Sequence, residues 1–209
     1  MEKSLIFIAG ESVFELSKQD IEWKLEEKPN EYGFLCIAAD PMIEGRLYAG
    51  TFDHGLWISD DKGTSWRSAG KGISHIRVPS VAVSPTEIRN GYHVVWAGTE
   101  PSGLFRSEDG GESWTEHPNL LNLPSRSTWS FPPRPYTHHA KWIEPDLHDK
   151  NRIFVGIELG GVMKSADKGQ TWEDRKPGSQ YDCHTLAMHP SAKGRIYEAA
   201  GGGYAESTD

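Results

Sequence analysis

The chain has 209 residues, 36% of them hydrophobic and 11% aromatic, which is enough for one large domain or two small ones with a proper core. Its 22 basic and 30 acidic residues give a formal net charge of −8, and no run of Lys or Arg stands out, so a nucleic-acid partner is not expected. No apolar stretch approaches the ~20 residues of a membrane span, and the first apolar run is too short for a signal peptide, so we expect a cytoplasmic protein with no membrane partner.

Short apolar runs bounded by Gly, Pro and Asp follow one another along the chain without helical periodicity. "LIFIAG", "VFELS" and "IEWKLEE" predict three strands near the N-terminus. A run ending in proline ("LCIAADP"), a second run ("GRLYAGT") and a third ("GLWIS") come next. Similar runs recur in the same order further on, among them "VAVSP", "YHVVWAGT" and "GLFRS". The sequence therefore predicts an all-β protein built from a repeated unit.

An eight-residue box closes each unit. "SDDKGTSW", "SEDGGESW" and "SADKGQTW" share the pattern S-x-D-x-G-x-[ST]-W, and "STD" at residues 207–209 begins a fourth copy. A decayed copy lies between Ser17 and Trp23. The positions common to the three complete boxes are Ser59, Asp61, Gly63, Trp66, Ser107, Asp109, Gly111, Trp114, Ser165, Asp167, Gly169 and Trp172.

Two interpretations of the box can be weighed on chemistry. In a tight turn, Ser and Asp side chains bond nearby backbone N–H groups, Gly adopts a conformation that other residues resist, and Trp covers apolar surface. A calcium loop of the EF-hand kind would need several oxygen ligands, whereas the boxes share one Asp. We therefore expect a structural turn with no metal, and we expect the box tryptophans, Trp23 included, to lie in the core.

Four short strands repeating every ~40–60 residues predict a β-propeller with four-stranded antiparallel blades. The last copy stops inside its box, so we expect an N-terminal fragment of about 4–5 blades out of 6–8. The expected blades of this single domain are approximately residues 1–32, 33–78, 79–136, 137–182 and 183–209.

The repeated pattern resembles the Asp-box, or BNR repeat, of sialidases, oligoxyloglucan-degrading glycosidases, sortilin-type receptors and photosystem assembly factors. The resemblance covers essentially the whole chain. It implies a propeller with its boxes at the blade periphery and a ligand site at the central channel, near the innermost strand of each blade. It leaves the function open, because this fold hosts enzymes, receptors and scaffolds.

The segments that enter the innermost strands hold the candidate ligand residues. Aligning the segments on their terminal prolines places Pro79, His139 and His184 in one register, and Arg77, Thr137 and Asp182 two residues earlier. Imidazole beside carboxylate suits acid–base chemistry or metal binding, although histidines at strand starts can simply be solvated. The residues expected to converge near the axis are Arg77, His138, His139, Asp182 and His184.

A Pro-rich insertion at residues 116–139 adds aromatic and basic side chains. Trp129, Tyr136 and Arg134 would suit a lip over the pocket, with the aromatic rings stacking on a sugar or a peptide. The alternative is that these aromatic residues pack the loop against the blade.

Three functions remain open from the sequence. The leading hypothesis is binding of a carbohydrate, or another small ligand, at the axial pocket. The second is a sialidase-like glycosidase, because Arg77-Val78-Pro79 resembles the Arg-Ile-Pro motif of sialidases and because Asp182 and Glu158 could form a carboxyl pair. The third is a scaffold with a protein partner. No phosphate-binding glycine loop is present, so no cofactor is expected.

Overall fold

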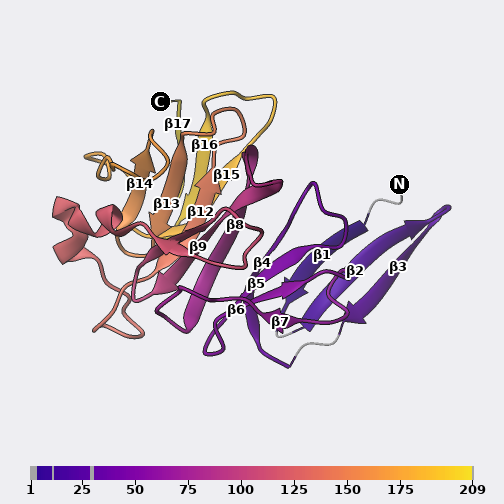
Figure 1. Ribbon diagram of the computed structural model, residues 1–209. Coiled ribbons are helices and arrows are strands. Elements are labelled where there is room, and N and C mark those ends of the chain that lie inside the picture. The colour runs from indigo at the N-terminus through magenta and orange to yellow at the C-terminus, as the bar shows by residue number, and fades with distance from the viewer. Residues whose placement is uncertain (1–3, 11, 29–30, 209) are drawn as a thin grey trace.

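The computed structural model describes residues 4–10, 12–28 and 31–208. Within them the chain forms five antiparallel sheets that follow one another in sequence order, from the indigo N-terminal sheet to the yellow C-terminal one (Figure 1). The first two sheets contain β1 Ser4–Ala9, β2 Ser12–Gln19 and β3 Glu22–Lys28, then β4 Phe34–Ala39, β5 Leu47–Thr51, β6 Leu56–Ser59 and β7 Arg67–Ser68. The other three contain β8 Arg77–Arg89, β9 Tyr92–Glu100, β10 Leu104–Ser107 and β11 Thr115–Glu116, then β12 Ala140–Pro145, β13 Ile153–Ile157 and β14 Gly161–Ser165, then β15 Cys183–Met188, β16 Ile196–Ala200 and β17 Gly203–Ser207.

Each sheet is a meander in which neighbours in sequence are also neighbours in space. The first strands of consecutive sheets, β4, β8, β12 and β15, lie against one another in succession. These strands are therefore the innermost ones, and the later strands of each sheet point outward. The prediction of an all-β propeller with antiparallel blades is confirmed.

The cores lie between consecutive sheets. The middle strands β5 and β13 are buried at every position, because a neighbouring sheet covers each of their two faces. Sheet faces that pack in this way read as continuous apolar runs, which matches "LYAGT" and "IFVGI". Full burial of one such Val, Leu or Ile side chain contributes about 1.5–3 kcal/mol.

Two details of the strands differ from the expected pattern. The fourth strand of the β12–β14 sheet is reduced to a single bridge between Lys164 and Glu173. Trp23, expected in the core, is 61% exposed on β3, because the decayed box around it does not form the turn that holds the other box tryptophans.

The three complete boxes form the same turn. In each, the Ser Oγ accepts a hydrogen bond of 2.8 Å from the Gly N–H and donates one of 2.8–2.9 Å to the Asp carboxylate. The same carboxylate accepts the backbone N–H four residues after it, at 2.7–3.0 Å. The box glycines have φ between +78° and +88°, the left-handed region that favours glycine. The groups that donate these hydrogen bonds to the Ser and Asp oxygens all belong to the same box, as in a structural turn.

The insertion between β11 and β12 folds onto the side of the β12–β14 sheet. It contains two short 3₁₀ helices, η1 Pro118–Asn122 and η2 Pro124–Thr128. Leu120 and Trp129 are buried in the same core cluster as Ile153 and Ile157. In the described part of the chain, no helix has the length and apolar character needed to cross a membrane.

Candidate ligand site at the inner strand ends

Polar side chains from three consecutive sheets gather at one edge, where each innermost strand begins and the next strand ends. Arg77 begins β8 and pairs with Glu100, the last residue of β9. His139 directly precedes β12, and Glu158 directly follows β13. Asp182 directly precedes β15. Because antiparallel neighbours share these ends, the fold brings together residues that are far apart in sequence.

Glu100 is the centre of this group. Its side chain is 1% exposed. It accepts hydrogen bonds of 2.6 and 2.7 Å from Arg134 and one of 2.9 Å from Arg77. Burial alone would raise the pKa of Glu100, but Arg134, Arg77 and His139 outweigh burial and hold that pKa below its ordinary value. Glu100 is therefore a carboxylate that fixes two guanidinium groups, one at the start of β8 and one in the insertion between β11 and β12.

His139 joins this carboxylate to a second one. Its Nε2 lies 2.8 Å from Glu158 Oε2, and its Nδ1 lies 3.4 Å from Glu100 Oε2. The imidazole is 5% exposed, whereas the Glu158 side chain is 22% exposed. A buried imidazole that contacts both carboxylates links them and fixes the orientation of the outer one, Glu158.

Asp182 and His184 continue the row on the β15–β17 sheet. His184 Nε2 lies 3.2 Å from Asp182 Oδ1, and both side chains are partly exposed. Glu158, Asp182 and His184 each place one donor atom within 4.8 Å of the other two. Two oxygens and one nitrogen could together hold a divalent cation with open positions for other ligands.

Aromatic side chains flank the guanidinium groups. Arg77 lies over the ring of Phe52 at 4.0 Å, and Arg134 lies over Phe131 at 4.5 Å. The Phe131 ring also packs on His139, with 4.4 Å between centroids. Tyr136 is 84% exposed, so its ring is available to a ligand.

Two expected ligand residues lie beneath this surface instead. Trp129 is 6% exposed, and its Nε1 donates a hydrogen bond of 2.9 Å to Ser125, so it packs the insertion onto the blade. His138 packs edge-on against Trp129 at 5.5 Å. Burial lowers the pKa of His138, and its Nδ1 has no hydrogen-bond partner. Trp129 thus follows the alternative in which the aromatic residues pack the loop against the blade, and a ligand role for the half-buried His138 stays a prediction.

The strand pairing also corrects the register expected from the prolines. Val81, Ile143 and Leu186 pair with corresponding residues of the second strands. Counting four residues back from each places Arg77, His139 and Asp182 in one register. The proline alignment failed because Pro145 lies only two residues after Ile143, whereas Pro85 and Pro190 each lie four residues after Val81 and Leu186.

Sequence reasoning missed Glu100 and Phe52, although a signal for both was present. The second strands align as "YAGTF", "WAGTE" and "FVGIE", so Phe52, Glu100 and Glu158 occupy the same position of the repeat. Glu158 was recognised at this position, and carrying the same position back by one repeat would have found Glu100.

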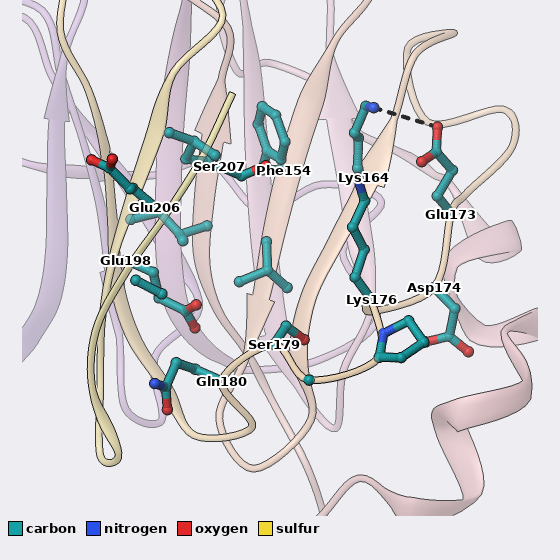
Figure 2. A pocket seen from close by; sticks show the side chains of 16 residues that line it. Phe154, Lys164, Glu173, Asp174, Lys176, Ser179, Gln180, Glu198, Glu206 and Ser207 are labelled. Atoms are coloured by element: carbon teal, nitrogen blue, oxygen red, sulfur yellow. Dashed lines mark ion pairs between the residues drawn. The ribbon is translucent and has the colours of Figure 1, made fainter. Parts of the chain in front are cut away.

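A cavity lined by side chains lies elsewhere, between the β12–β14 and β15–β17 sheets (Figure 2). Its lining includes Phe154, Lys164 and Glu198 and none of the row described above. The polar groups of the row are held in place by ion pairs and hydrogen bonds to one another.

The five meander sheets and their inward first strands define the class of the protein as a β-propeller. No family model and no curated protein sequence matches the chain. Among solved structures, it is similar to an ancestral GH74 enzyme, with a TM-score of 0.62 at 19% identity over 84% of this chain and 22% of that one. YCF48 from Cyanidioschyzon merolae matches with a TM-score of 0.66 at 11% identity over 97% of this chain and 63% of that one. The GH74 xyloglucanase from Xanthomonas campestris matches with a TM-score of 0.50 at 15% identity over 96% of this chain and 41% of that one. The chain thus spans less than two thirds of the length of these neighbours, and at such identities the likeness shows the fold alone.

Proposed function

We propose that the chain belongs to an Asp-box propeller that binds a neutral carbohydrate at the inner strand ends. The observation that carries this proposal is the row of fixed polar side chains from three consecutive blades, with the exposed ring of Tyr136 beside it. Sugar sites combine planar hydrogen-bonding groups that fix hydroxyls with aromatic rings that pack on the sugar face.

The charge balance of the row favours a neutral ligand over an anionic one. Arg77 and Arg134 both pair with the single carboxylate of Glu100. With the carboxylates of Glu158 and Asp182 the row holds three acidic groups against two guanidinium groups, so its formal charge, with neutral histidines, disfavours a sugar carboxylate. This is why the resemblance of Arg77-Val78-Pro79 to a sialidase motif does not extend, in our proposal, to binding of sialic acid. The xyloglucan-degrading neighbour supplies a suitable neutral probe.

Thermal stabilisation by xyloglucan oligosaccharides, with N-acetylneuraminic acid as the anionic comparison, tests this proposal. We expect a response to the neutral oligosaccharide that Asp182→Asn and Tyr136→Ala each weaken about tenfold in Kd, or about 1.4 kcal/mol. Tyr204→Ala is the matched control, because Tyr204 is an exposed tyrosine on β17, outside the row. Two results would overturn the proposal: absence of any stabilisation by the saccharides, or the same affinity for the neutral oligosaccharide in Asp182→Asn, Tyr136→Ala and Tyr204→Ala.

A glycoside hydrolase is the second candidate, and the proximity of two carboxyl groups favours it. Glu158 and Asp182 offer carboxylate oxygens within 4.8 Å of each other. Paired carboxyl groups about 5–5.5 Å apart are those of retaining glycosidases. Turnover of an aryl glycoside that is lost in both Glu158→Gln and Asp182→Asn would make the protein an enzyme. Binding without turnover would leave the carbohydrate-binding proposal in place. A protein partner lost on deletion of residues 118–136, without any saccharide response, would instead indicate a scaffold.

A further inference from the structure

A groove separates the outer parts of the last two sheets. It has a volume of about 330 Å³. Figure 2 shows its two walls, with Phe154 and Lys164 on one side and Glu198 and Glu206 on the other. Its apolar lining comes from Phe154, Val162, Leu186, Ile196 and Ala205. An ion pair of 3.6 Å between Lys164 and Glu173 lies at the rim.

The corresponding surfaces of earlier sheets are covered by box turns. A methyl group placed on Gly111 would lie 2.5 Å from Ile58 Cδ1 and 2.9 Å from Tyr48 Cε1, so this box lies directly on β5 and β6. A methyl group placed on Gly169 would lie 3.3 Å from Trp96 Cη2, so the next box lies on β9. Each of these boxes covers the sheet that precedes its own.

Hydrogen bonds also join these turns to the sheet that they cover. Lys168, in the third complete box, donates a hydrogen bond of 2.7 Å to the buried Glu87 of the preceding sheet. Arg46 donates one of 3.1 Å to the carbonyl of Gly110 in the second box. Trp114 Nε1 donates one of 2.8 Å to the carbonyl of Ala69. A box is therefore bound to its neighbour by a ring, a glycine and charged groups together.

Strand pairing shows that the groove is the same surface, one repeat later. Trp96 pairs with Arg106, as Phe154 pairs with Lys164. The partner of Lys164 on its other side is Glu173. The wall formed by Phe154 and Lys164 thus corresponds to the positions on which the earlier boxes lie.

The opposite wall includes the strand position from which a box would start. Ser165 begins the third box and pairs with Ile153. Ser207 pairs with Ile196 in the same way on β16 and β17. A turn that continued from Ser207 along the path of the other boxes would therefore reach the wall formed by Phe154.

We propose that this groove is a docking site for a peptide turn of the box pattern, D-x-G-x-[ST]-W, entered from Ser207. The glycine of that turn lies over Phe154, where a side chain would collide, and the tryptophan covers Val162 and Leu186. Lys164 and Glu173 at the rim provide charged partners for the polar positions of the turn.

A grafted turn tests the proposal. Appending K-G-Q-T-W-E-D-R, the sequence of residues 168–175, after Asp209 completes a box at the correct place. The melting temperature should rise by about 5 °C or more, because the graft covers apolar surface on both walls. Hydrogen exchange should slow in β14 and in residues 173–180, which lie beside the groove, and stay unchanged in β1–β3.

Matched grafts separate docking from a nonspecific effect of a longer chain. A graft with Ala in place of its Trp, and one with Val in place of its Gly, should each lose most of the stabilisation and the local protection. Equal stabilisation by all three grafts, or a graft that leaves the exchange of β14 unchanged, would overturn the proposal. Neither outcome depends on saccharide binding, since the groove and the row of inner strand ends share no residues.

Discussion

Replacing Glu100 by glutamine tests the electrostatic centre of the candidate site. The substitution keeps the shape of the side chain and removes the charge that three hydrogen bonds from Arg77 and Arg134 now satisfy. Removing one partner of a buried ion pair costs about 3–5 kcal/mol. Because each arginine side chain is 24% exposed and can regain water, we expect the lower end, about 3 kcal/mol.

Thermal and urea unfolding at pH 7 measure this effect. For a domain of this size, a loss of about 3 kcal/mol corresponds to a melting temperature lower by about 6–12 °C. The matched control is Glu112→Gln. Glu112 also pairs with an arginine, Arg67, but its side chain is 57% exposed, so we expect a change within about 0.5 kcal/mol. A Glu100→Gln variant as stable as this control would refute the idea that the carboxylate holds the two guanidinium groups in place.

The pH dependence of the difference provides an independent check. The pKa of Glu100 is lower in the folded protein than its ordinary value of 4.5, so the folded protein binds this proton less tightly than the unfolded chain. The stabilisation is therefore complete above about pH 4.5 and disappears as the pH falls through the folded-state pKa. The gap between Glu100→Gln and the wild type should be largest at neutral pH and shrink below about pH 4.

Three further predictions concern other parts of the fold. Burial raises the pKa of Glu144 to about 7, so the folded protein loses stability as the pH rises from 4.5 towards 7. In urea unfolding, Glu144→Gln should be as stable as the wild type at about pH 4 and more stable by up to about 3 kcal/mol at about pH 8. A difference in stability that does not change with pH would contradict this. Gly111→Ala should cost at least about 2 kcal/mol more than Gly63→Ala, although both glycines have positive φ. A methyl group at Gly111 would meet Ile58 of the preceding sheet at 2.5 Å, whereas at Gly63 the nearest atom belongs to Trp66 of the same box, at 3.4 Å, and Val13 of the preceding sheet is 3.8 Å away. Equal melting temperatures of the two variants would show that the second box does not press on its neighbour. Burial raises the pKa of Cys36 to about 12 and also raises the pKa of Cys183. The buried Cys183 and the partly buried Cys36 should therefore react with a disulfide reagent at pH 8 about a hundredfold more slowly in the folded protein than in urea, and rapid labelling of the folded chain would contradict this.

The fold was predictable because the information for it is local and repeated. Each blade needs the same turn, and the box that makes this turn can be seen in eight residues such as "SADKGQTW". Alternation of short apolar runs then fixes the strands between boxes. Trp23 shows the limit of this reasoning: it is exposed, whereas Trp114 is buried and Trp66 and Trp172 are partly buried in complete boxes that hold them.

The candidate site was predictable only in part, because its geometry depends on strand pairing rather than on sequence spacing. Arg77, His139 and Asp182 were found from their places before the innermost strands. Glu100 was missed because its role comes from the two arginines that fold onto it, and Arg134 arrives from an insertion whose path the sequence does not determine. Trp129 was placed on the surface because exposure of an aromatic ring in a loop depends on what the loop packs against.

The position of each box on the preceding sheet gives the array a direction. A repeat protein whose units contact only their neighbours unfolds unit by unit, with a coupling energy at every junction. Here residues of the later unit make many of the contacts at a junction. Lys168 donates a hydrogen bond to Glu87, and Gly111 packs against Tyr48 of the sheet before it. Local opening of one unit therefore uncovers the unit before it and leaves the unit after it covered by its own follower. Because the contact energy of a junction is lost whichever of its two units opens, the two units stabilise each other equally, although only the earlier unit has its apolar face covered by the box of the other.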